Sequence, residues 1–131
     1  YVLFDVDNFK SINDTYGHLI GDKVLQDLTT SIKPYLQTND LFGRYGGDEF
    51  AILLVDKNEH KATEIIKQIK QSIQPLIVKD LVVNYSISMG VVTTVPTNDI
   101  HLEVLYTSCD KALYTAKSNG RNVFVKEKLE S

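Results

Sequence analysis

The fold is decided by the segment LFGRYGGDEFAILLV, residues 41–55. Two strand-like runs, Leu41–Tyr45 and Phe50–Val55, flank the pair Gly46-Gly47, and glycines between hydrophobic runs are a strong signal for a tight turn. The segment is therefore predicted to form a β-hairpin. The acids Asp48 and Glu49 directly follow the two glycines, which would let another molecule approach the backbone closely.

Strand and helix patterns alternate on both sides of this hairpin. Runs rich in β-branched and aromatic residues predict strands, and hydrophobic residues at helical spacing predict amphipathic helices. Before the hairpin we expect a buried strand over Tyr1–Val6, a polar loop or short helical turn over Asp7–Asp14, and a helix over Gly21–Leu36 that kinks or ends near Pro34. After the hairpin we expect a helix with Ala62 to Ile73 on one face, closed by Pro75, and then a long strand over Leu81–Thr94 with Gly90 as the expected break. A third helix, capped by Asn98 or Asp99, would carry an apolar stripe from Leu102 to Ala116 and end at Asn119-Gly120, before a last strand over Val123–Val125. This order predicts an α/β sandwich, in which helices flank a mixed central sheet.

Length and composition favour one globular domain and exclude several classes of protein. The chain has 131 residues, of which 43% are hydrophobic and 24% charged, enough for a core. The net charge of −3 argues against broad nucleic-acid binding. The longest apolar runs, such as Phe50–Val55, fall far short of the roughly 20 residues that a membrane span needs, so no membrane contact is expected from the domain itself. The single cysteine, Cys109, is predicted to be a buried core thiol, and a cytoplasmic location is the default, although the parent protein could be tethered to a membrane.

Two pairs of acidic residues are candidates for binding a divalent cation. Asp5 and Asp7 flank Val6 at the end of the first predicted strand, and alternation along a strand would point both the same way. Asp48 and Glu49 follow the glycine turn. Mg²⁺ takes one or two carboxylates together with substrate phosphates, so carboxylates at a strand end and on a neighbouring hairpin suit it. Solvated turn acids are the alternative, which is favoured for either pair alone and is weaker for both together.

Basic residues suggest a ligand that carries phosphate. The candidates are Lys10, Lys117 and Arg121. Lys117 lies in the last turn of the third predicted helix, where a cation also offsets the helix dipole. Arg121 follows the glycine that ends this helix and equally suits a solvated loop. Spacing alone favours neither phosphate binding nor these structural roles for Lys117 and Arg121.

Three polar residues around the start of the first predicted helix suggest recognition of a base. The Asp22 carboxylate can accept from the ring N–H and exocyclic amine of guanine, while the Asn13 amide can donate to a base acceptor. Helix capping is the commoner role of Asn and Asp there. His18 has no partner at metal-ligand spacing, so a structural or solvent-facing histidine is the simpler interpretation.

Five blocks of this sequence together resemble the GGDEF domains, the diguanylate cyclases. The blocks are Phe4–Lys10, Asn13–His18 with Gly21-Asp22, Arg44–Phe50, Ser86–Val91, and Asp110–Lys117 with Asn119–Asn122. They occur in the family's order across nearly the whole chain. The five ordered blocks are stronger evidence than the Gly-Gly-acid-Glu-Phe signature alone.

This resemblance implies a fold like the palm of nucleotidyl cyclases and polymerases, and the reaction 2 GTP → cyclic di-GMP + 2 pyrophosphate. It implies two Mg²⁺ or Mn²⁺ ions per site and a second GGDEF domain in a homodimer, since each domain would hold one GTP. The implied metal ligands are Asp5, the Val6 carbonyl and Asp48, the implied catalytic residues are Asp48, Glu49 and Lys10, and the implied substrate-binding residues are Phe9, Asn13, His18, Asp22, Leu25, Gly46, Gly47, Lys117 and Arg121. Asp48 would also help to deprotonate the attacking ribose 3′-hydroxyl.

The chain departs from the family pattern at two places. An inhibitory product site, Arg-x-x-Asp, often precedes the signature, and here Gln37-Thr38-Asn39-Asp40 stands in its place, so strong feedback inhibition is not expected. The family's N-terminal helical segment is missing, so residues 1–131 are expected to be one GGDEF domain without that segment. Two alternatives to an active cyclase stay open. One is a catalytically silent GTP-binding module that controls an attached or partner domain, and the other is a palm-like cyclase with a mononucleotide product.

Overall fold

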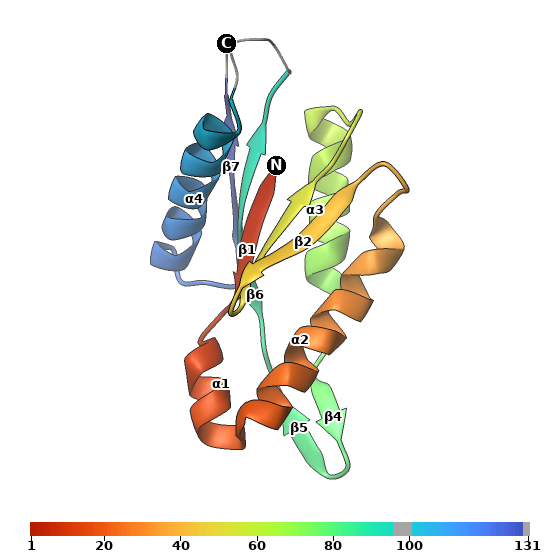
Figure 1. Cartoon of the computed structure of the whole chain (residues 1–131), viewed down its shortest axis with the longest axis vertical. Coiled ribbons are helices and arrows are strands. Elements are labelled where there is room, and N and C mark those ends of the chain that lie inside the picture. The colour runs from red at the N-terminus through yellow and green to blue at the C-terminus, as the bar shows by residue number, and fades with distance from the viewer. Residues whose placement is uncertain (96–100, 130–131) are drawn as a thin grey trace.

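The computed structural model describes residues 1–95 and 101–129 and contains a sheet between helices (Figure 1). The five strands have the order β2-β3-β1-β6-β7 and pair antiparallel, except for the parallel pair β6–β7. They are β1 (Val2–Val6), β2 (Leu41–Gly46), β3 (Glu49–Leu53), β6 (Ile87–Thr93) and β7 (Phe124–Lys128). The predicted fold class, a mixed sheet flanked by helices, is confirmed.

Helices cover both faces of this sheet, with α2 and α3 on one face and α4 on the other (Figure 1). The helices are α1 (Phe9–Tyr16), α2 (His18–Ile32), α3 (Glu59–Ser72) and α4 (Leu102–Ser118), and a 3₁₀ turn over Lys33–Tyr35 follows α2. Two further strands, β4 (Leu76–Val78) and β5 (Leu81–Val83), form a separate antiparallel hairpin, of which β4 was not predicted.

Alternation along β1 divides the core into two parts. The residues that pack with α2 and α3 are Val2, Phe4 and Val6. Leu3 faces the other way, into a smaller cluster with α4. Asp5 has the same parity as Leu3, so its side chain lies on the α4 side of the sheet. The strand period thus brings a carboxylate under the helix that carries Lys117.

The hairpin around the two glycines forms as predicted. Gly46 lies opposite Glu49 at the end of β2, and a bulge precedes this pair. Gly47 has a φ of 54°, a left-handed conformation that glycine adopts without steric cost. Because β3 also pairs with β1, where Asp5 lies opposite Glu49, the turn delivers Asp48 and Glu49 to the end of the central strand.

The first predicted helix is wrong in its bounds. Two helices, α1 and α2, stand where a polar loop or short helical turn over Asp7–Asp14 and a helix over Gly21–Leu36 were expected. They meet at Gly17, whose φ of 90° interrupts the helix. The apolar stripe continues across this corner, so helical spacing alone does not reveal it. The helical end near Pro34 is confirmed, because α2 gives way to the 3₁₀ turn there.

The long strand predicted over Leu81–Thr94 is also wrong, because it is two strands that break at residues 84–86 and not at Gly90. Gly90 lies within β6, directly under α4. A Cβ at this position would lie 2.3 Å from the carbonyl oxygen of Cys109 and 2.5 Å from the backbone nitrogen of Leu113. The Cys109 thiol is buried as expected and donates to the Gly90 carbonyl at 2.9 Å, and burial raises the pKa of this thiol to about 12.

The third predicted helix is α4, with two differences from expectation. Its predicted cap, Asn98 or Asp99, lies outside the described residues. Leu102 was placed on the apolar stripe, but its side chain is 64% exposed, so the buried stripe begins later. The end of the helix is confirmed: Gly120 has a φ of 102°, and two closing hydrogen bonds run from the backbone of Gly120 to Lys117 and from Arg121 to Ala116. The last strand runs on to Lys128.

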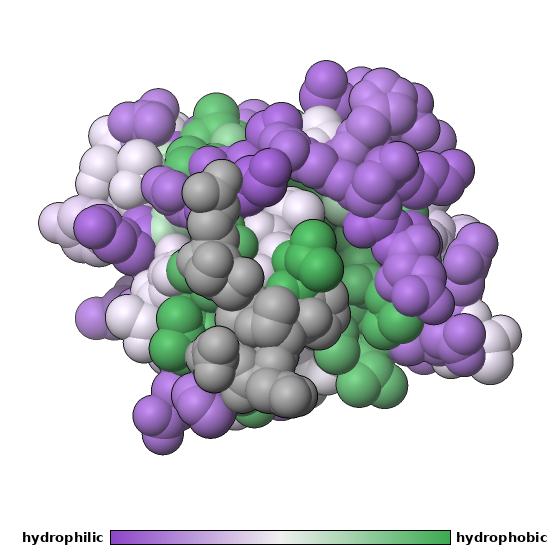
Figure 2. All heavy atoms as spheres, turned by 90° about the horizontal axis from the view of Figure 1, so that it is seen from above, coloured by the Kyte–Doolittle hydropathy of each residue, from purple (hydrophilic) through white to green (hydrophobic). Residues whose placement is uncertain are grey.

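Figure 2 looks down on the end of the molecule where β1 begins, and hydrophobic side chains gather there between hydrophilic ones. Within residues 1–95 and 101–129, no helix is both long and apolar enough to cross a membrane.

Candidate active site

An acidic cluster forms where the hairpin turn meets the end of β1. Asp5 lies on β1, Glu49 is its partner across the β1–β3 ladder, and Asp48 lies in the turn just before. Lys117, from the last turn of α4, forms an ion pair with the Asp5 Oδ2. The structure therefore brings together four residues from three separate parts of the sequence.

Burial gives this cluster an unusual charge balance. The Asp5 side chain is only 6% exposed, and this burial raises its pKa, although the hydrogen bond and charge of Lys117 partly oppose the rise, and the nearby charges of Asp48 and Asp7 add to it. Burial acts to lower the pKa of Lys117, but Asp5 foremost, then Asp48 and Glu49, outweigh it and raise that pKa. The site holds an excess of negative charge that one lysine does not neutralise.

The donor atoms fit a hard divalent cation. Among the described residues, the Asp5 Oδ1 is the buried side-chain oxygen or nitrogen atom with no hydrogen-bond partner. A buried carboxylate oxygen without a partner is costly, and a cation would satisfy it. Carboxylate and carbonyl oxygens are the ligands that Mg²⁺ and Mn²⁺ prefer, and Asp5, Val6 and Asp48 offer both. No group of three or more His, Cys, Asp or Glu side chains is arranged for a metal ion within the part of the chain that the structure describes.

Asp7, which the sequence pairs with Asp5 as a candidate for binding a cation, is already engaged by hydrogen-bond donors of the protein itself. It follows β1, and its two oxygens accept hydrogen bonds from the hydroxyls of Ser86 and Ser88 and from the backbone N–H of Asn122. These donors occupy the carboxylate. Asp7 is a structural acid in this site.

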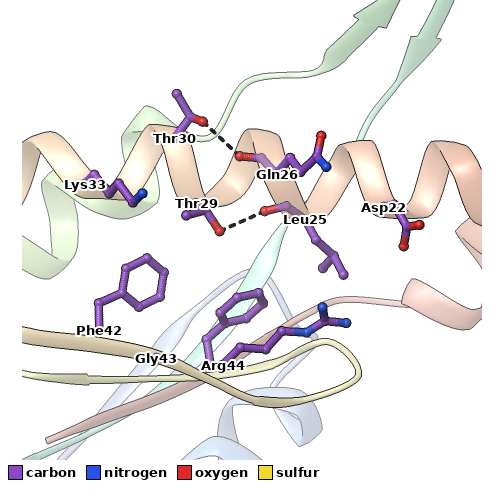
Figure 3. A pocket seen from close by; sticks show the side chains of 10 residues that line it. Asp22, Leu25, Gln26, Thr29, Thr30, Lys33, Phe42, Gly43 and Arg44 are labelled. Atoms are coloured by element: carbon purple, nitrogen blue, oxygen red, sulfur yellow. Dashed lines mark hydrogen bonds between the residues drawn. The ribbon is translucent and has the colours of Figure 1, made fainter.

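A cavity of about 600 Å³ lies between α2 and the β2–β3 hairpin (Figure 3). Asp22 and Leu25 of α2 line it, as do Arg44 of β2 and Phe50 of β3. In Figure 3 the Arg44 side chain extends below Leu25 toward the end of the cavity where Asp22 lies. A volume in the range of small-ligand sites, with an apolar wall and a carboxylate at one end, suits a purine base.

The corner between α1 and α2 places three further candidates beside this cavity. Gly21 is buried, and a Cβ there would lie 1.8 Å from the Asn13 Oδ1 and 3.3 Å from the Phe9 ring. Asn13 and Phe9 therefore lie against the bare backbone of α2, although neither lines the cavity itself. Lys10 and His18 are exposed, in the first turns of α1 and α2 respectively.

Arg121 lies in the loop after α4, one residue beyond Gly120, and is exposed. Its backbone φ is 63°, and that of the next residue, Asn122, is 53°. Asparagine tolerates left-handed backbone, but for Arg121 it is sterically unfavourable. The loop thus holds a strained conformation next to the end of the helix that carries Lys117.

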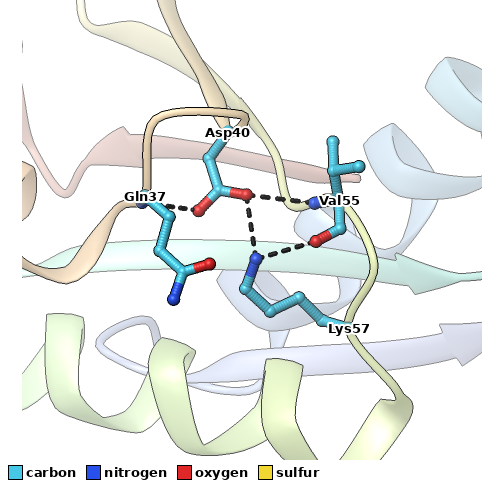
Figure 4. A network of polar contacts seen from close by, with 4 residues as sticks. All are labelled: Gln37, Asp40, Val55 and Lys57. Atoms are coloured by element: carbon cyan, nitrogen blue, oxygen red, sulfur yellow. Dashed lines mark hydrogen bonds and ion pairs between the residues drawn. The ribbon is translucent and has the colours of Figure 1, made fainter.

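The segment before β2 is tied to the end of β3 by a buried ion pair (Figure 4). The Asp40 carboxylate accepts from the backbone N–H groups of Gln37 and Val55, and the Lys57 ammonium donates to it at 3.0 Å. The side chain of Asp40 is 0% exposed. Burial acts to raise its pKa, but these hydrogen bonds and the charge of Lys57 outweigh that effect and lower it.

Comparison with known sequences identifies the family. The profile of the family described as "Diguanylate cyclase, GGDEF domain" matches residues 1–123. The chain belongs to the GGDEF family. The resemblance carried by the five sequence blocks is therefore confirmed at the level of the family.

Curated relatives are similar to this GGDEF domain over almost its whole length. The probable diguanylate cyclase DgcT of Escherichia coli K12 is 34% identical over 128 residues, which cover 95% of this chain and 28% of the relative. Diguanylate cyclase A of Treponema denticola is 36% identical over 126 residues, or 92% of this chain and 33% of the relative. The response regulator PleD of Caulobacter vibrioides is 37% identical over 128 residues, which cover 95% of this chain and 28% of the relative. The chain thus spans about a third or less of the length of these relatives.

Solved structures share the fold of this GGDEF domain. The GGDEF domain of DgcB from Caulobacter crescentus, in complex with c-di-GMP, superposes with a TM-score of 0.87 and 25% identity, over 95% of this chain and 75% of that chain. The active GGEEF domain of a diguanylate cyclase from Vibrio cholerae superposes with a TM-score of 0.81 and 32% identity, over 95% of this chain and 80% of that chain.

Sequence reasoning missed one residue that shapes the site of this GGDEF domain. The Nε of Arg44 donates to the Gly47 carbonyl at 2.7 Å, so Arg44 braces the turn as well as lining the cavity. A basic residue immediately before a glycine turn is a signal for such a brace, but a solvent-exposed strand residue gives the same signal.

Proposed function

We propose that this GGDEF domain is a diguanylate cyclase domain, which condenses two molecules of GTP into cyclic di-GMP and releases two pyrophosphates. The observation that carries the proposal is the acidic cluster, in which a buried Asp5 oxygen next to Asp48 and Glu49 finds no hydrogen-bond partner within residues 1–95 and 101–129. A domain that had lost its chemistry would have no need to retain a buried, excess negative charge. Curated relatives of the domain are named diguanylate cyclases.

The acids would hold two Mg²⁺ or Mn²⁺ ions, with Asp5, the Val6 carbonyl and Asp48 as the protein ligands. Such ions, when bound, supply neutralisation of charge at the attacking and leaving oxygens. With its carboxylate partner engaged as a metal ligand, Lys117 would be able to turn from Asp5 to a substrate phosphate. Glu49 supports the same cluster from the β3 side.

The remaining candidates divide between the phosphates and the base of GTP. Phe9, Lys10, Lys117 and Arg121 would contact the phosphates, and Lys10 would stabilise the developing charge in the transition state. Asp22 and Asn13 would recognise the guanine edge, with Leu25 packing under the base in the cavity. The Gly46-Gly47 turn would let the phosphates approach the backbone. His18 would lie near the nucleotide from the exposed start of α2.

Each ring closure joins two nucleotides that two domains hold. Asp48 would help to remove the proton from the ribose 3′-hydroxyl, and the 3′-oxygen would attack the α-phosphorus of the GTP on the partner domain. The new P–O bond forms as the bond to pyrophosphate breaks. The same step in the opposite direction closes the ring, so a two-fold homodimer is the natural arrangement for the reaction. Because the reaction consumes GTP, a cytoplasmic nucleotide, a cytoplasmic location belongs to the same proposal.

The test is a reaction of concentrated protein with GTP and Mg²⁺, in which the products are separated by chromatography. We expect cyclic di-GMP and pyrophosphate in a one-to-two ratio, and no product from Asp48→Asn. The matched control is Asp56→Asn, which removes one exposed charge outside the cluster. A mononucleotide product would contradict the proposal. GTP binding without any product at high protein concentration would favour the silent regulatory module.

A further inference from the structure

The Asp7 carboxylate connects three segments that are far apart in the sequence. It is 7% exposed and follows β1. Its Oδ2 accepts from the Ser86 hydroxyl at 2.6 Å and from the Asn122 backbone N–H at 3.0 Å, and its Oδ1 accepts from the Ser88 hydroxyl at 2.5 Å. One carboxylate thus joins the end of β1, the start of β6 and the loop between α4 and β7.

The loop that Asp7 contacts is held in an unfavourable conformation. Gly120, Arg121 and Asn122 have φ values of 102°, 63° and 53° in succession. Glycine adopts such a backbone freely and asparagine tolerates it, but for Arg121 it is sterically unfavourable. Backbone strain of this kind persists only where the surroundings enforce it.

Two groups of hydrogen bonds enforce it. On the helix side, the Arg121 N–H donates to the Ala116 carbonyl at 3.2 Å. On the sheet side, the Asn122 N–H donates to Asp7 and also to the Ser88 Oγ at 3.2 Å, while the Lys70 ammonium donates to the Asn122 Oδ1 at 2.8 Å. The backbone of Arg121 is therefore fixed on one side by the end of α4 and on the other by the contact of Asn122 with the Asp7 carboxylate.

We infer that Asp7 is a positioning residue, which holds the loop after α4 so that Arg121 meets the terminal phosphates of the nucleotide, with Lys70 as a second support of the same loop. The inference rests on the proposed function, because it assigns Arg121 to the phosphates. Without Asp7, the Asn122 N–H keeps only its longer hydrogen bond to the Ser88 Oγ, and the Ser88 hydroxyl loses the carboxylate that it donates to. The loop then relaxes toward negative φ, and the Arg121 guanidinium leaves the place where the phosphates lie.

This role predicts a selective defect that a general loss of structure does not produce. Arg121 reaches only the terminal phosphates, so its displacement weakens the binding of a triphosphate and leaves the binding of GMP unchanged. The role also predicts rescue by the amide. In the Asp7→Asn variant the amide oxygen still accepts from the Asn122 N–H, and the Ser88 hydroxyl can turn to accept from the new NH₂ group. A metal ligand would not be rescued in this way, because the amide lacks the charge.

The test measures binding by calorimetry in the presence of Mg²⁺, with GMP and with a GTP analogue that has a non-cleavable α,β-methylene bridge. The variants are Asp7→Ala, Asp7→Asn, Arg121→Ala and the double variant Asp7→Ala/Arg121→Ala. We expect Asp7→Ala to weaken analogue binding about tenfold, as for one lost charge-assisted contact, with GMP affinity within about twofold. Asp7→Asn should stay within about threefold of the wild type, and the double variant should match Arg121→Ala.

Equal losses for GMP and the analogue would overturn the inference, as would additive losses in the double variant or an Asp7→Asn defect as large as that of Asp7→Ala. If Asp7→Ala does not fold, Lys70→Met replaces it. That change should weaken only analogue binding, by about two- to threefold, and an unselective or absent loss would count against the inference. The affinities of the wild-type protein for GMP and for the analogue distinguish a failure of this inference from a failure of the proposed function. If the wild type binds GMP as tightly as the analogue, both fail, whereas a wild-type preference for the analogue that Asp7→Ala retains removes the inference alone.

Discussion

Lys117 pairs with Asp5 across the interface between α4 and the sheet, and the other Asp5 oxygen has no hydrogen-bond partner among the residues that the structure describes. The ammonium stands where a cation is needed, but one lysine faces three carboxylates. This pair explains why the cluster is compatible with folding without a ligand. Under the proposed function, a metal ion would replace the lysine at the Asp5 carboxylate.

Asp5→Asn is expected to abolish product formation without lowering the melting temperature of the metal-free protein. Burial raises the Asp5 pKa, so the folded state favours the protonated carboxyl, and ionisation costs stability as the pH rises through that pKa. A neutral amide removes this cost. Thermal unfolding with a chelator present and a chromatographic product assay check the two halves of this prediction. A melting temperature several degrees lower would mean that the Lys117 pair stabilises the fold more than burial penalises it.

Gly21→Ala is expected to impair GTP binding while the helix itself stays intact. Alanine favours a helix by about 1 kcal/mol over glycine, but its methyl group would occupy the place of the Asn13 Oδ1, 1.8 Å away. Asn13 must then turn away from the base. We expect the KM for GTP to rise about tenfold, the usual effect of losing one polar contact to a base.

The companion variant Asn13→Ala tests the route of this effect. Combined with Gly21→Ala, it should add no further loss of GTP affinity, because the two changes remove the same contact. Additive losses would show that Gly21 acts through another part of the corner, such as the Phe9 ring.

The parts of this structure that the sequence predicts are those decided by local chemistry. The hairpin follows from its glycine turn, and the end of α4 follows from Asn119-Gly120, because in both places the conformation depends on residues close by. The acidic cluster was predicted for a similar reason, since strand alternation and one hairpin bring Asp5 and Asp48 together.

The sequence-based predictions fail where contacts with a segment distant in the sequence determine the local structure. A glycine within a predicted strand indicates a break, but at Gly90 the strand continues. Glycine is needed there because the backbone of α4 lies too close to leave room for a side chain. Asp7 and Asp5 are equivalent in the sequence pattern. Donors beside and within β6 and in the loop after α4, more than 75 residues away, occupy the Asp7 carboxylate, whereas Asp5 pairs with Lys117.

Gly90→Ala is expected to destabilise the domain by about 3 kcal/mol, because the methyl group would overlap backbone atoms of α4 that cannot move without the helix. The matched control is Gly43→Ala in the edge strand β2, where a Cβ meets nothing within 4 Å, so its effect should stay within about 0.5 kcal/mol. Urea unfolding of both variants gives the comparison. Equal free energies of unfolding would mean that α4 shifts to accept the methyl group.

Cyclic di-GMP is expected not to inhibit the proposed cyclase activity strongly through the segment before β2. Gln37 lacks the guanidinium that would bind guanine and phosphate together, and the Asp40 carboxylate is already engaged by Lys57 and two backbone N–H groups. Initial rates with increasing amounts of added product test this expectation. Strong inhibition that Gln37→Ala abolishes would contradict it.

Asp40 is expected to stabilise the domain at neutral pH and to lose this effect in acid. Its carboxyl has a lowered pKa in the folded state, so its stabilisation is fully present above the unfolded value of about 3.9 and disappears as the pH falls through the folded value. Asp40→Asn at pH 7 leaves the buried Lys57 ammonium without its counter-charge, which typically costs about 3–5 kcal/mol. Urea unfolding of the variant and the wild type should therefore differ by this amount at pH 7 and by much less near pH 2. Asp56→Asn is the matched control, because Asp56 is exposed, its φ of 56° suits asparagine equally well, and the change in charge is identical. A loss of equal size at both pH values would mean that the hydrogen bonds of Asp40, and not its charge, hold the segment before β2 against β3.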